Sequence, residues 1–291
     1  MWKGYELVKE PPPTIFHVTH WKAGSQWVAG ILKQSAPERF VSWKTVSASA
    51  NRGAGTANFY TEPLKPGTIY GTVYTPRAIF TKLVFGLFWR SQKGPYQKET
   101  YLFIHPSRAL RNWWNFGIKR NPCKTFVVIR DIRDTLVSLY FSTKHSHPLE
   151  VDAMVTRRNM LNELGEEDGL IYMMDEALWA VAEIQSSWIK TSDALLFRYE
   201  EIINNEIAFF ESLIEYCEIE VERETLHNII KYNAFRSVVG RERGEEDPRS
   251  HYRKGVAGDW KNHFTDKVKD EFKKKYGQLL VDTGYENDLS W

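Results

Sequence analysis

Residues Ile15–Leu32, IFHVTHWKAGSQWVAGIL, decide the fold of this chain, because an apolar run stops at Lys22 and Gly24 and then resumes with helical spacing. The first positions suit a buried or half-buried strand. The apolar residues from Trp27 to Leu32 fall on one face of a helix. The stretch therefore predicts a strand, a tight loop and a helix.

The loop between them, Trp21 to Gln26, has the chemistry of an anion-binding site. A helix start leaves free backbone N–H groups at the positive end of the helix dipole, and Gly24 permits a turn beside the charge of Lys22. In a Walker loop, GxxxxGK[ST], the lysine follows the second glycine, whereas Lys22 precedes a single glycine. We therefore expect a phosphate or sulfate ligand in a P-loop-like strand–loop–helix, and a P-loop kinase or GTPase is disfavoured.

The composition favours one large domain over residues 1–291. The chain is 42% hydrophobic, which suffices for a large core, and no Pro/Gly/Ser-rich linker or repeat divides it. A net charge of +2 argues against general nucleic-acid binding but permits a local phosphate pocket.

Cysteine usage and the N-terminus indicate a cytoplasmic protein. Cys123 and Cys217 are too few for a disulfide framework or a zinc cluster, and the first residues lack the apolar core of a signal peptide. Ile79–Trp89 is apolar, but Lys82 and Gly86 interrupt it and it is too short to span a bilayer. No transmembrane segment and no metal are expected.

Strands and helices alternate along the chain. The patterns predict strands at Arg39–Val46, Gly67–Tyr74, Thr125–Ile129 and Ala194–Tyr199, a loop at Ala48–Asn58, and helices at Arg77–Trp89, Val151–Leu164, Leu170–Lys190, Ile203–Cys217 and Arg223–Tyr232. This order predicts an α/β fold with a central, mostly parallel sheet flanked by helices. Ligands of such sheets bind at the carboxyl ends of the strands.

Two further segments have phosphate-binding chemistry. Arg130 follows a buried strand, and Ser138 lies eight residues later on the next helix, so a guanidinium and a hydroxyl can meet one phosphate. Near the C-terminus, His251–Thr265 reads HYRKGVAGDWKNHFT and combines two adjacent cations with a glycine that allows close backbone approach.

The chain resembles the 3′-phosphoadenosine 5′-phosphosulfate (PAPS) dependent sulfotransferases of the cytosolic type. HWKAGSQW is similar to the family loop YPKSGTTW, VVIRDIRDTLVSLYFS to the 3′-phosphate segment, and RKGVAGDWKNHFT to the C-terminal signature. The three motifs follow the family's order and, with the strand LLFRYEEI, bracket roughly residues 14–265. Ala23 and Gln26 depart from the family's Ser and Thr.

The resemblance implies a binding site for PAPS and its product, adenosine 3′,5′-bisphosphate. Carried over by position, the site consists of Lys22, Ala23, Gly24, Ser25, Gln26, Trp27, Arg130, Ser138, Tyr199, Phe235, Arg253, Lys254 and Gly255. The first loop would wrap the 5′ end, the other two motifs would hold the 3′-phosphate, and Tyr199 and Phe235 would lie near the nucleotide. A doubly charged phosphate needs charge-assisted donors from two directions, which these cations can supply.

The implied reaction is in-line transfer of a sulfuryl group to a hydroxyl acceptor. Lys22 is the candidate that stabilises the charge on the leaving oxygen. The family places a histidine at a strand end as general base. His105 and His147 are the two catalytic candidates here, and His20, His145 or no histidine remain open. If the strand Gly67–Tyr74 takes the family's position, Thr72, Val73 or Tyr74 replaces that histidine.

The identity of the acceptor is not determined by the sequence. The aromatic segment Phe80–Trp114 favours a small hydrophobic or aromatic partner such as a phenol or a lipid alcohol. A non-catalytic adenosine 3′,5′-bisphosphate-binding protein is the alternative from another class, and Lys22 argues against it. The oligomeric state stays open.

Overall fold

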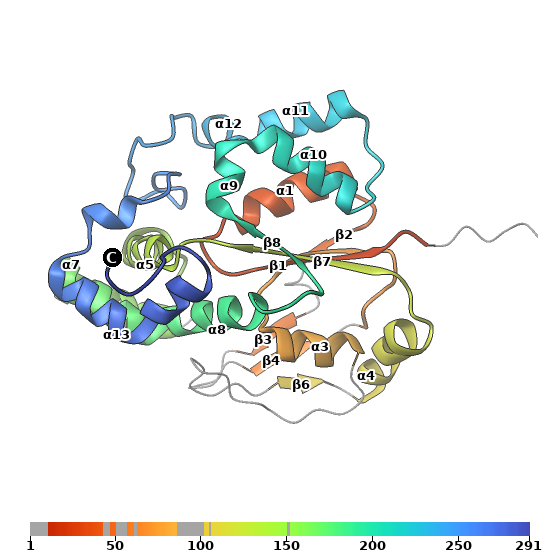
Figure 1. Ribbon diagram of the computed structural model, residues 1–291, viewed down its shortest axis with the longest axis horizontal. Helices are drawn as coiled ribbons and strands as arrows, with labels where there is room; N and C mark the ends of the chain where they lie inside the picture. Colours follow the sequence, from red (N-terminus) through yellow and green to blue (C-terminus); the bar gives the residue numbers. More distant parts are fainter. Residues whose placement is uncertain are drawn as a thin grey trace, which may run out of the picture.

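Five strands form the central sheet, and all neighbouring strands in it are parallel (Figure 1). They lie in the order β2 (Phe40–Ser42), β5 (Ile69–Val73), β1 (Thr14–Thr19), β7 (Cys123–Ile129) and β8 (Leu195–Arg198). The computed structural model describes residues 11–42, 47–50, 57–60, 63–85, 102–104, 106–149 and 152–291. Within these residues the predicted α/β fold with a parallel sheet is confirmed.

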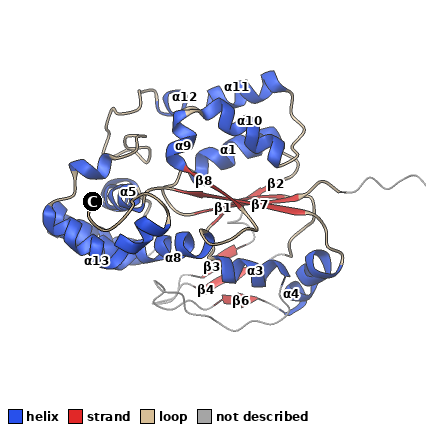
Figure 2. Ribbon diagram, viewed as in Figure 1, coloured by secondary structure: helices blue, strands red, loops and turns tan. Residues whose placement is uncertain are grey.

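Helices cover both faces of this sheet (Figure 2). One face carries α1 (Ser25–Ser35), α9 (Tyr199–Asn204), α10 (Glu206–Tyr216), α11 (Arg223–Asn233) and α12 (Phe235–Val239). The other carries α3 (Arg77–Phe85), α4 (Pro106–Asn112), the π-helical turn η1 (Trp113–Ile118) and α8 (Trp179–Trp188). The remaining helical elements are α5 (Ile132–Phe141), η2 (Ser142–Ser146), α6 (Asp152–Glu163), α7 (Glu166–Met173), η3 (Met174–Leu178), η4 (Asp259–Asn262) and α13 (Asp266–Asp282).

The alternation of side chains along β1 explains why both faces need helices. Ile15 packs with Phe126 in the core cluster that includes α1 and α10, whereas Phe16 and Val18 pack in the cluster that includes α3 and α8. All six residues of β1 are buried. A third core cluster joins α5, α7, α8 and α13. Among the described residues, no helix is both long enough and apolar enough to cross a bilayer.

A second, three-stranded sheet lies beside α3 and was not predicted (Figure 1). Its strands are β3 (Ser47–Ala50), β4 (Ala57–Tyr60) and β6 (Leu102–Ile104). The loop predicted at Ala48–Asn58 is therefore wrong at both ends, because β3 and β4 pair there as antiparallel strands. The small residues of this stretch have weak strand propensity, and β4 is also stabilised by β6, which is distant in sequence.

Two predicted helices also need correction. The helix expected at Ile203–Cys217 is broken, because the side chain of Asn205 accepts the Ala208 N–H (3.3 Å) and starts a new helix. The helix expected at Leu170–Lys190 begins earlier, at Glu166, and contains the π-helical turn η3. The helices expected at Val151–Leu164 and Arg223–Tyr232 are confirmed as α6 and α11.

Candidate functional site

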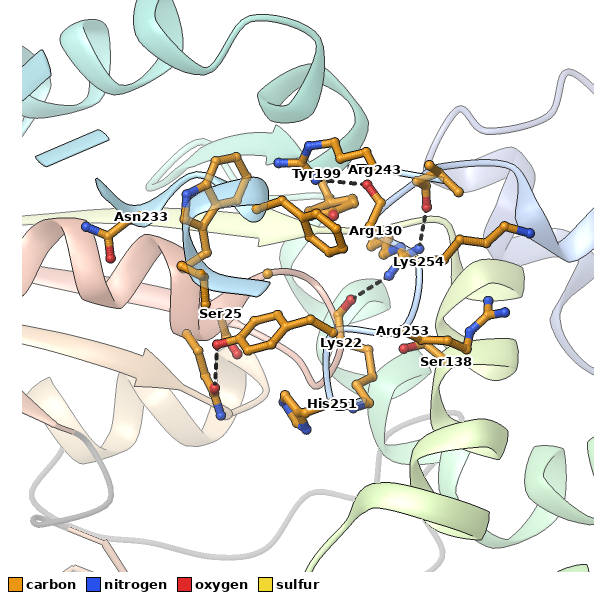
Figure 3. Close-up of a pocket in the computed structure, with 18 residues that line it drawn as sticks. Lys22, Ser25, Arg130, Ser138, Tyr199, Asn233, Arg243, His251, Arg253 and Lys254 are labelled. Carbon is orange, nitrogen blue, oxygen red and sulfur yellow. Dashed lines mark hydrogen bonds between the residues drawn. The ribbon is translucent and has the colours of Figure 1, made fainter. Parts of the chain in front are cut away.

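A cavity of about 240 Å³ opens at the carboxyl ends of β1, β7 and β8 (Figure 3). Lys22 lies in the loop after β1, Arg130 follows β7 directly, and Tyr199 follows β8 directly. Because parallel strands end at the same edge of a sheet, residues far apart in sequence meet there. The segment around Arg253 closes the cavity from the C-terminal part of the chain.

Twelve of the thirteen residues predicted for the cofactor site line this one cavity. They are Lys22, Gly24, Ser25, Gln26, Trp27, Arg130, Ser138, Tyr199, Phe235, Arg253, Lys254 and Gly255. Ala23 belongs to the same loop, but it is completely buried and does not line the cavity. The cations from the beginning, middle and end of the chain therefore converge on one cavity.

The first loop is shaped by two left-handed residues, Lys22 (φ 68°) and Gly24 (φ 73°). A Cβ atom on Gly24 would come within 3.0 Å of the Tyr199 ring, so both the conformation and the space favour glycine. Helix α1 starts at Ser25 without a side-chain cap, which leaves N–H groups of its first turn for a ligand. Burial, and secondarily the charge of Arg130, lowers the pKa of Lys22 to about 8.

Arg130 joins the first loop to the C-terminal segment. Its Nη1 donates to the Lys22 carbonyl oxygen (3.1 Å), and its Nη2 donates to the Val256 carbonyl oxygen (2.9 Å). The guanidinium lies 4.7 Å from the centre of the Tyr199 ring. Its Nε is buried and has no hydrogen-bond partner in the structure. The side chain therefore holds two motifs together and retains an N–H group that can donate a hydrogen bond to an anion.

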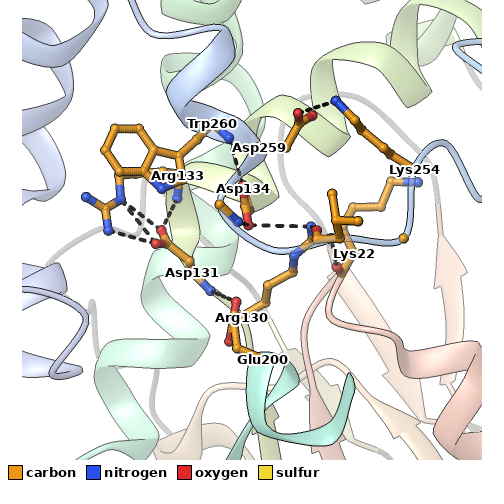
Figure 4. Close-up of polar contacts among 12 residues, drawn as sticks. Lys22, Arg130, Asp131, Arg133, Asp134, Glu200, Lys254, Asp259 and Trp260 are labelled. Atoms are coloured by element: carbon orange, nitrogen blue, oxygen red, sulfur yellow. Dashed lines mark hydrogen bonds and ion pairs between the residues drawn. The ribbon is translucent and has the colours of Figure 1, made fainter. Parts of the chain in front are cut away.

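Asp134, in the first turn of α5, anchors the C-terminal motif (Figure 4). Its carboxylate accepts the backbone N–H groups of Gly258 (2.7 Å) and Trp260 (2.9 Å) and lies 3.7 Å from Arg130. The carboxylate is completely buried, so these donors replace the water that it loses. This contact fixes the loop that carries Arg253 and Lys254 against α5.

Arg253 and Lys254 are held by two carboxylates. Arg253 pairs with Asp259 and with Glu246 (2.5 Å), while Lys254 lies 2.6 Å from Asp259 and 3.6 Å from Glu246. Burial acts to raise the pKa of Asp259, but hydrogen bonds from His263, Lys254 and Arg253 hold that pKa far below its usual value. Asp259 is therefore a permanent counter-charge beside the cavity.

Aromatic rings and Arg243 form another wall. The Arg243 guanidinium lies 5.4 Å from the Trp27 ring and 5.3 Å from the Phe235 ring, and it donates to the Gly255 carbonyl oxygen (2.8 Å). A Cβ atom on Gly255 would lie 2.6 Å from Phe235, so the chain can follow this path only with glycine. Flat apolar surfaces of this kind suit a nucleobase.

Six residues that line the cavity were missed by the sequence analysis: Asn233, Val238, Arg243, His251, Tyr252 and Val256. His251, Tyr252 and Val256 lie inside or beside the quoted C-terminal string, so their position in sequence was a usable signal. Arg243 had no such signal, because its role depends on how the chain folds back over Phe235.

The structure supports neither of the two histidines predicted as general base as a residue of the cavity wall within the described part of the chain. His105 lies outside the described residues, and the strand before it, β6, belongs to the second sheet. His147 is exposed and does not line the cavity. Of the two strands β5 and β6, it is β5 that pairs with β1, and Val73 and Tyr74 stand at its carboxyl end. The Tyr74 hydroxyl lies 2.8 Å from the Ser25 hydroxyl.

The other open candidates, His20 and His145, do not line the cavity either. His20 is completely buried, and its Nε2 accepts the Arg130 N–H (3.2 Å). Its Nδ1 lies 2.8 Å from the Trp21 carbonyl oxygen. Burial lowers the pKa of His20 to about 4. It is therefore a neutral ring that positions Arg130.

Comparisons with known proteins agree with this geometry. The family model of the sulfotransferase domain matches residues 12–284. Sulfotransferase 1 family member D1 of Mus musculus is 22% identical over 307 aligned residues, which cover 97% of this chain and 88% of that protein. Cytosolic sulfotransferase 3 of Arabidopsis thaliana is 26% identical over 163 residues, about half of each chain.

A solved structure has the same fold. The crystal structure of mouse sulfotransferase SULT7A1 complexed with PAP matches with a TM-score of 0.51 and 17% identity, over 94% of this chain and 86% of that one. At this identity the likeness concerns the fold alone. Since the family model covers nearly the whole chain, the chain belongs to the sulfotransferase family.

Proposed function

We propose that this protein transfers a sulfuryl group from PAPS to a hydroxyl group of a small hydrophobic or aromatic acceptor. Membership of the sulfotransferase family supports the reaction class. The observation that carries the proposal is the convergence of Lys22, Arg130 and Arg253 on one cavity. We further propose that residues 1–291 form one domain, since the family model spans 12–284.

The residues of the cavity fit a bisphosphorylated adenosine. Lys22 and the uncapped start of α1 offer positive charge and N–H donors at one end. Arg130, Ser138 and Lys254 offer cations and a hydroxyl at the other. The unpartnered Nε of Arg130 supports an anionic ligand, because a buried N–H group without an acceptor costs free energy.

Lys22 would promote the chemical step. When bound, PAPS supplies the sulfuryl group, and negative charge grows on its phosphate oxygen as the sulfur–oxygen bond breaks. A buried ammonium group beside that oxygen stabilises the charge more than one in water does. The low pKa of Lys22 also suits a group that can donate a proton to a leaving oxygen.

The acceptor hydroxyl must lose its proton, and three histidines are candidates for the base. His251 is the histidine that lines the cavity among the described residues. His147 and His105 remain the candidates from sequence. Replacing each by alanine in turn identifies the base as the variant that loses transfer while it retains binding of adenosine 3′,5′-bisphosphate.

Calorimetric titration with adenosine 3′,5′-bisphosphate tests the binding site. We expect binding that weakens by at least about tenfold for adenosine 5′-phosphate, which lacks the 3′-phosphate. Lys254→Ala should weaken binding, whereas Lys261→Ala should not, because Lys261 is close in sequence and does not line the cavity. Absence of binding, or equal effects of the two variants, contradicts the proposal.

Transfer is tested with labelled PAPS and a panel of phenols and hydrophobic alcohols. We expect sulfated product, and its loss in Lys22→Ala with bisphosphate binding largely retained. Binding of the bisphosphate without transfer to any acceptor would instead support a non-catalytic sensor.

A further inference from the structure

Positive charge is concentrated in one quarter of the chain. Residues 63–130 contain twelve Lys or Arg residues and one acidic residue, Glu99, whereas the whole chain has a net charge of only +2. The rest of the molecule is therefore acidic overall. Proteins with such a distribution meet anionic partners in a preferred orientation.

The outer face of α4 and η1, within this segment, is apolar. The two elements are continuous, and Ala109, Asn112 and Phe116 are buried on their inner side. On the outer side Leu110, Trp114 and Ile118 are 58%, 50% and 49% exposed. Their spacing of four residues places them in one row. We call these three residues the apolar row.

Cations flank the apolar row. Arg111, Lys119 and Arg120 are exposed, and the Lys119 ammonium lies 5.9 Å from the Trp114 ring. No acidic residue occurs between Glu99 and Asp131. An exposed tryptophan between aliphatic residues, surrounded by Lys and Arg, is the pattern of interfacial membrane-binding helices.

The location of the row leaves the cavity free. The turn η1 ends at Ile118, and β7 begins at Cys123, so the row lies near the amino ends of the strands. The cavity is at their carboxyl ends, and Figure 1 shows α4 on the side of the molecule away from α5 and α13. A surface docked on the row would not cover the cavity.

We propose that the apolar row docks this protein on an anionic membrane surface. Leu110, Trp114 and Ile118 enter the boundary between headgroups and acyl chains, and Arg111, Lys119 and Arg120 contact lipid phosphates and carboxylates. A second copy of the chain fits less well, because it would bring two clusters of like charge together. The inference does not depend on the proposed sulfuryl transfer.

Co-sedimentation of the full chain with vesicles tests the proposal. We expect binding to phosphatidylcholine vesicles that contain phosphatidylserine, little binding to phosphatidylcholine alone, and a loss of binding when salt is raised from about 0.1 M to about 0.5 M. Equal binding to both kinds of vesicle, or none to either, overturns the proposal.

Two variants separate the contributions of the row and its cations. The triple variant Leu110→Ser, Trp114→Ser and Ile118→Ser should lower the partition coefficient by at least about tenfold. The matched control Leu149→Ser, Ile207→Ser and Tyr232→Ser removes apolar side chains that are also well exposed, on other surfaces, and should leave partitioning unchanged. The triple variant Arg111→Gln, Lys119→Gln and Arg120→Gln should lower the partition coefficient for the anionic vesicles by at least about tenfold. Each cation near an anionic surface raises that coefficient by roughly fivefold.

Circular dichroism and thermal unfolding of all variants establish that each folds. If the row variant folds and still binds as tightly as the control, the proposal is wrong. Sedimentation velocity tests whether a second copy of the chain covers the apolar row instead. The membrane proposal is wrong if the original chain forms a concentration-dependent dimer that the row variant abolishes, and if the original chain does not bind vesicles.

Discussion

Glu246 and Arg253 form an ion pair at the wall of the cavity, with 2.5 Å between Oε1 and Nη1. The same carboxylate lies 3.6 Å from the Lys254 ammonium, so one acidic residue contacts both cations of the C-terminal motif. A phosphate that binds these cations must compete with Glu246. The carboxylate is therefore an internal competitor of the proposed ligand.

The first prediction follows from this competition. Glu246→Gln should raise the affinity for adenosine 3′,5′-bisphosphate by up to about fivefold, because a partly exposed ion pair of this kind contributes at most about 1 kcal/mol. Calorimetry at low and high salt measures the change. Glu242→Gln is the matched control, since Glu242 pairs with Arg236 on the open surface. An unchanged or weaker affinity in Glu246→Gln would show that Glu246 positions the cations.

The second prediction concerns the pH dependence of the proposed transfer. Burial lowers the pKa of Lys22 to about 8, so the free enzyme loses this charge as the pH rises through 8. We expect kcat/KM to fall above pH 8, while kcat falls at higher pH, because a bound anion favours the protonated amine. In Lys22→Arg the guanidinium stays charged, so a fall at pH 8 that persists in this variant contradicts the assignment.

The third prediction concerns the anchor made by Asp134. Asp134→Asn replaces one of two acceptor oxygens by an NH₂ group, which cannot accept the N–H of Gly258 or Trp260. We expect the free energy of unfolding to fall by about 2–4 kcal/mol, since the bonds are buried and charge-assisted. Urea unfolding measures it. Asp288→Asn, at an exposed residue near the C-terminus, should cost less than about 0.5 kcal/mol. Equal losses in the two variants would refute the anchor.

The fourth prediction concerns stability at low pH. Burial lowers the pKa of His17 to about 3 and that of His20 to about 4, so below pH 6.5 the unfolded chain binds protons that the folded chain does not. Stability should therefore fall as the pH falls, by about 2 kcal/mol per histidine between pH 7 and pH 5. Urea unfolding at the two pH values measures this loss.

A pair of variants isolates the contribution of His17, which stacks on Phe126 with 4.9 Å between ring centres. His17→Leu should lose about 2 kcal/mol less than the original chain between pH 7 and pH 5. Phe126→Leu disturbs the same contact without removing a titratable group, so its pH-dependent loss should match that of the original chain. If both variants behave alike, burial of His17 is not the cause.

The first strand, loop and helix could be predicted because a few neighbouring residues determine them. Hydrophobic spacing marks β1 and α1, and Gly24 marks the left-handed turn. The strands β3 and β4 could not, because the small residues of β3 have weak strand propensity and β4 also depends on β6, which is distant in sequence. The pairing of β5 rather than β6 with β1, on which the choice of His105 as a candidate depended, could not be predicted either, because no local pattern encodes it.

The site residues divide in the same way. Lys22, Arg130 and Arg253 are found by charge beside a strand end or a glycine, and the fold brings them together at one sheet edge. Arg243 reaches the cavity only because its segment folds back, so that its guanidinium contacts Phe235 and the Gly255 carbonyl oxygen. Such a role follows from tertiary structure and has no signature in sequence.

The clamp of Arg130 on Val256, together with the bonds of Asp134 to Gly258 and Trp260, has a consequence for biosynthesis. A nascent chain on the ribosome carries both side chains long before residues 256–260 emerge from the exit tunnel. Until then α5 lacks the partners of its buried carboxylate, and the cavity lacks a wall. Ligand therefore cannot assist the early stages of folding during translation, and it can stabilise only chains in which residues 256–260 have emerged.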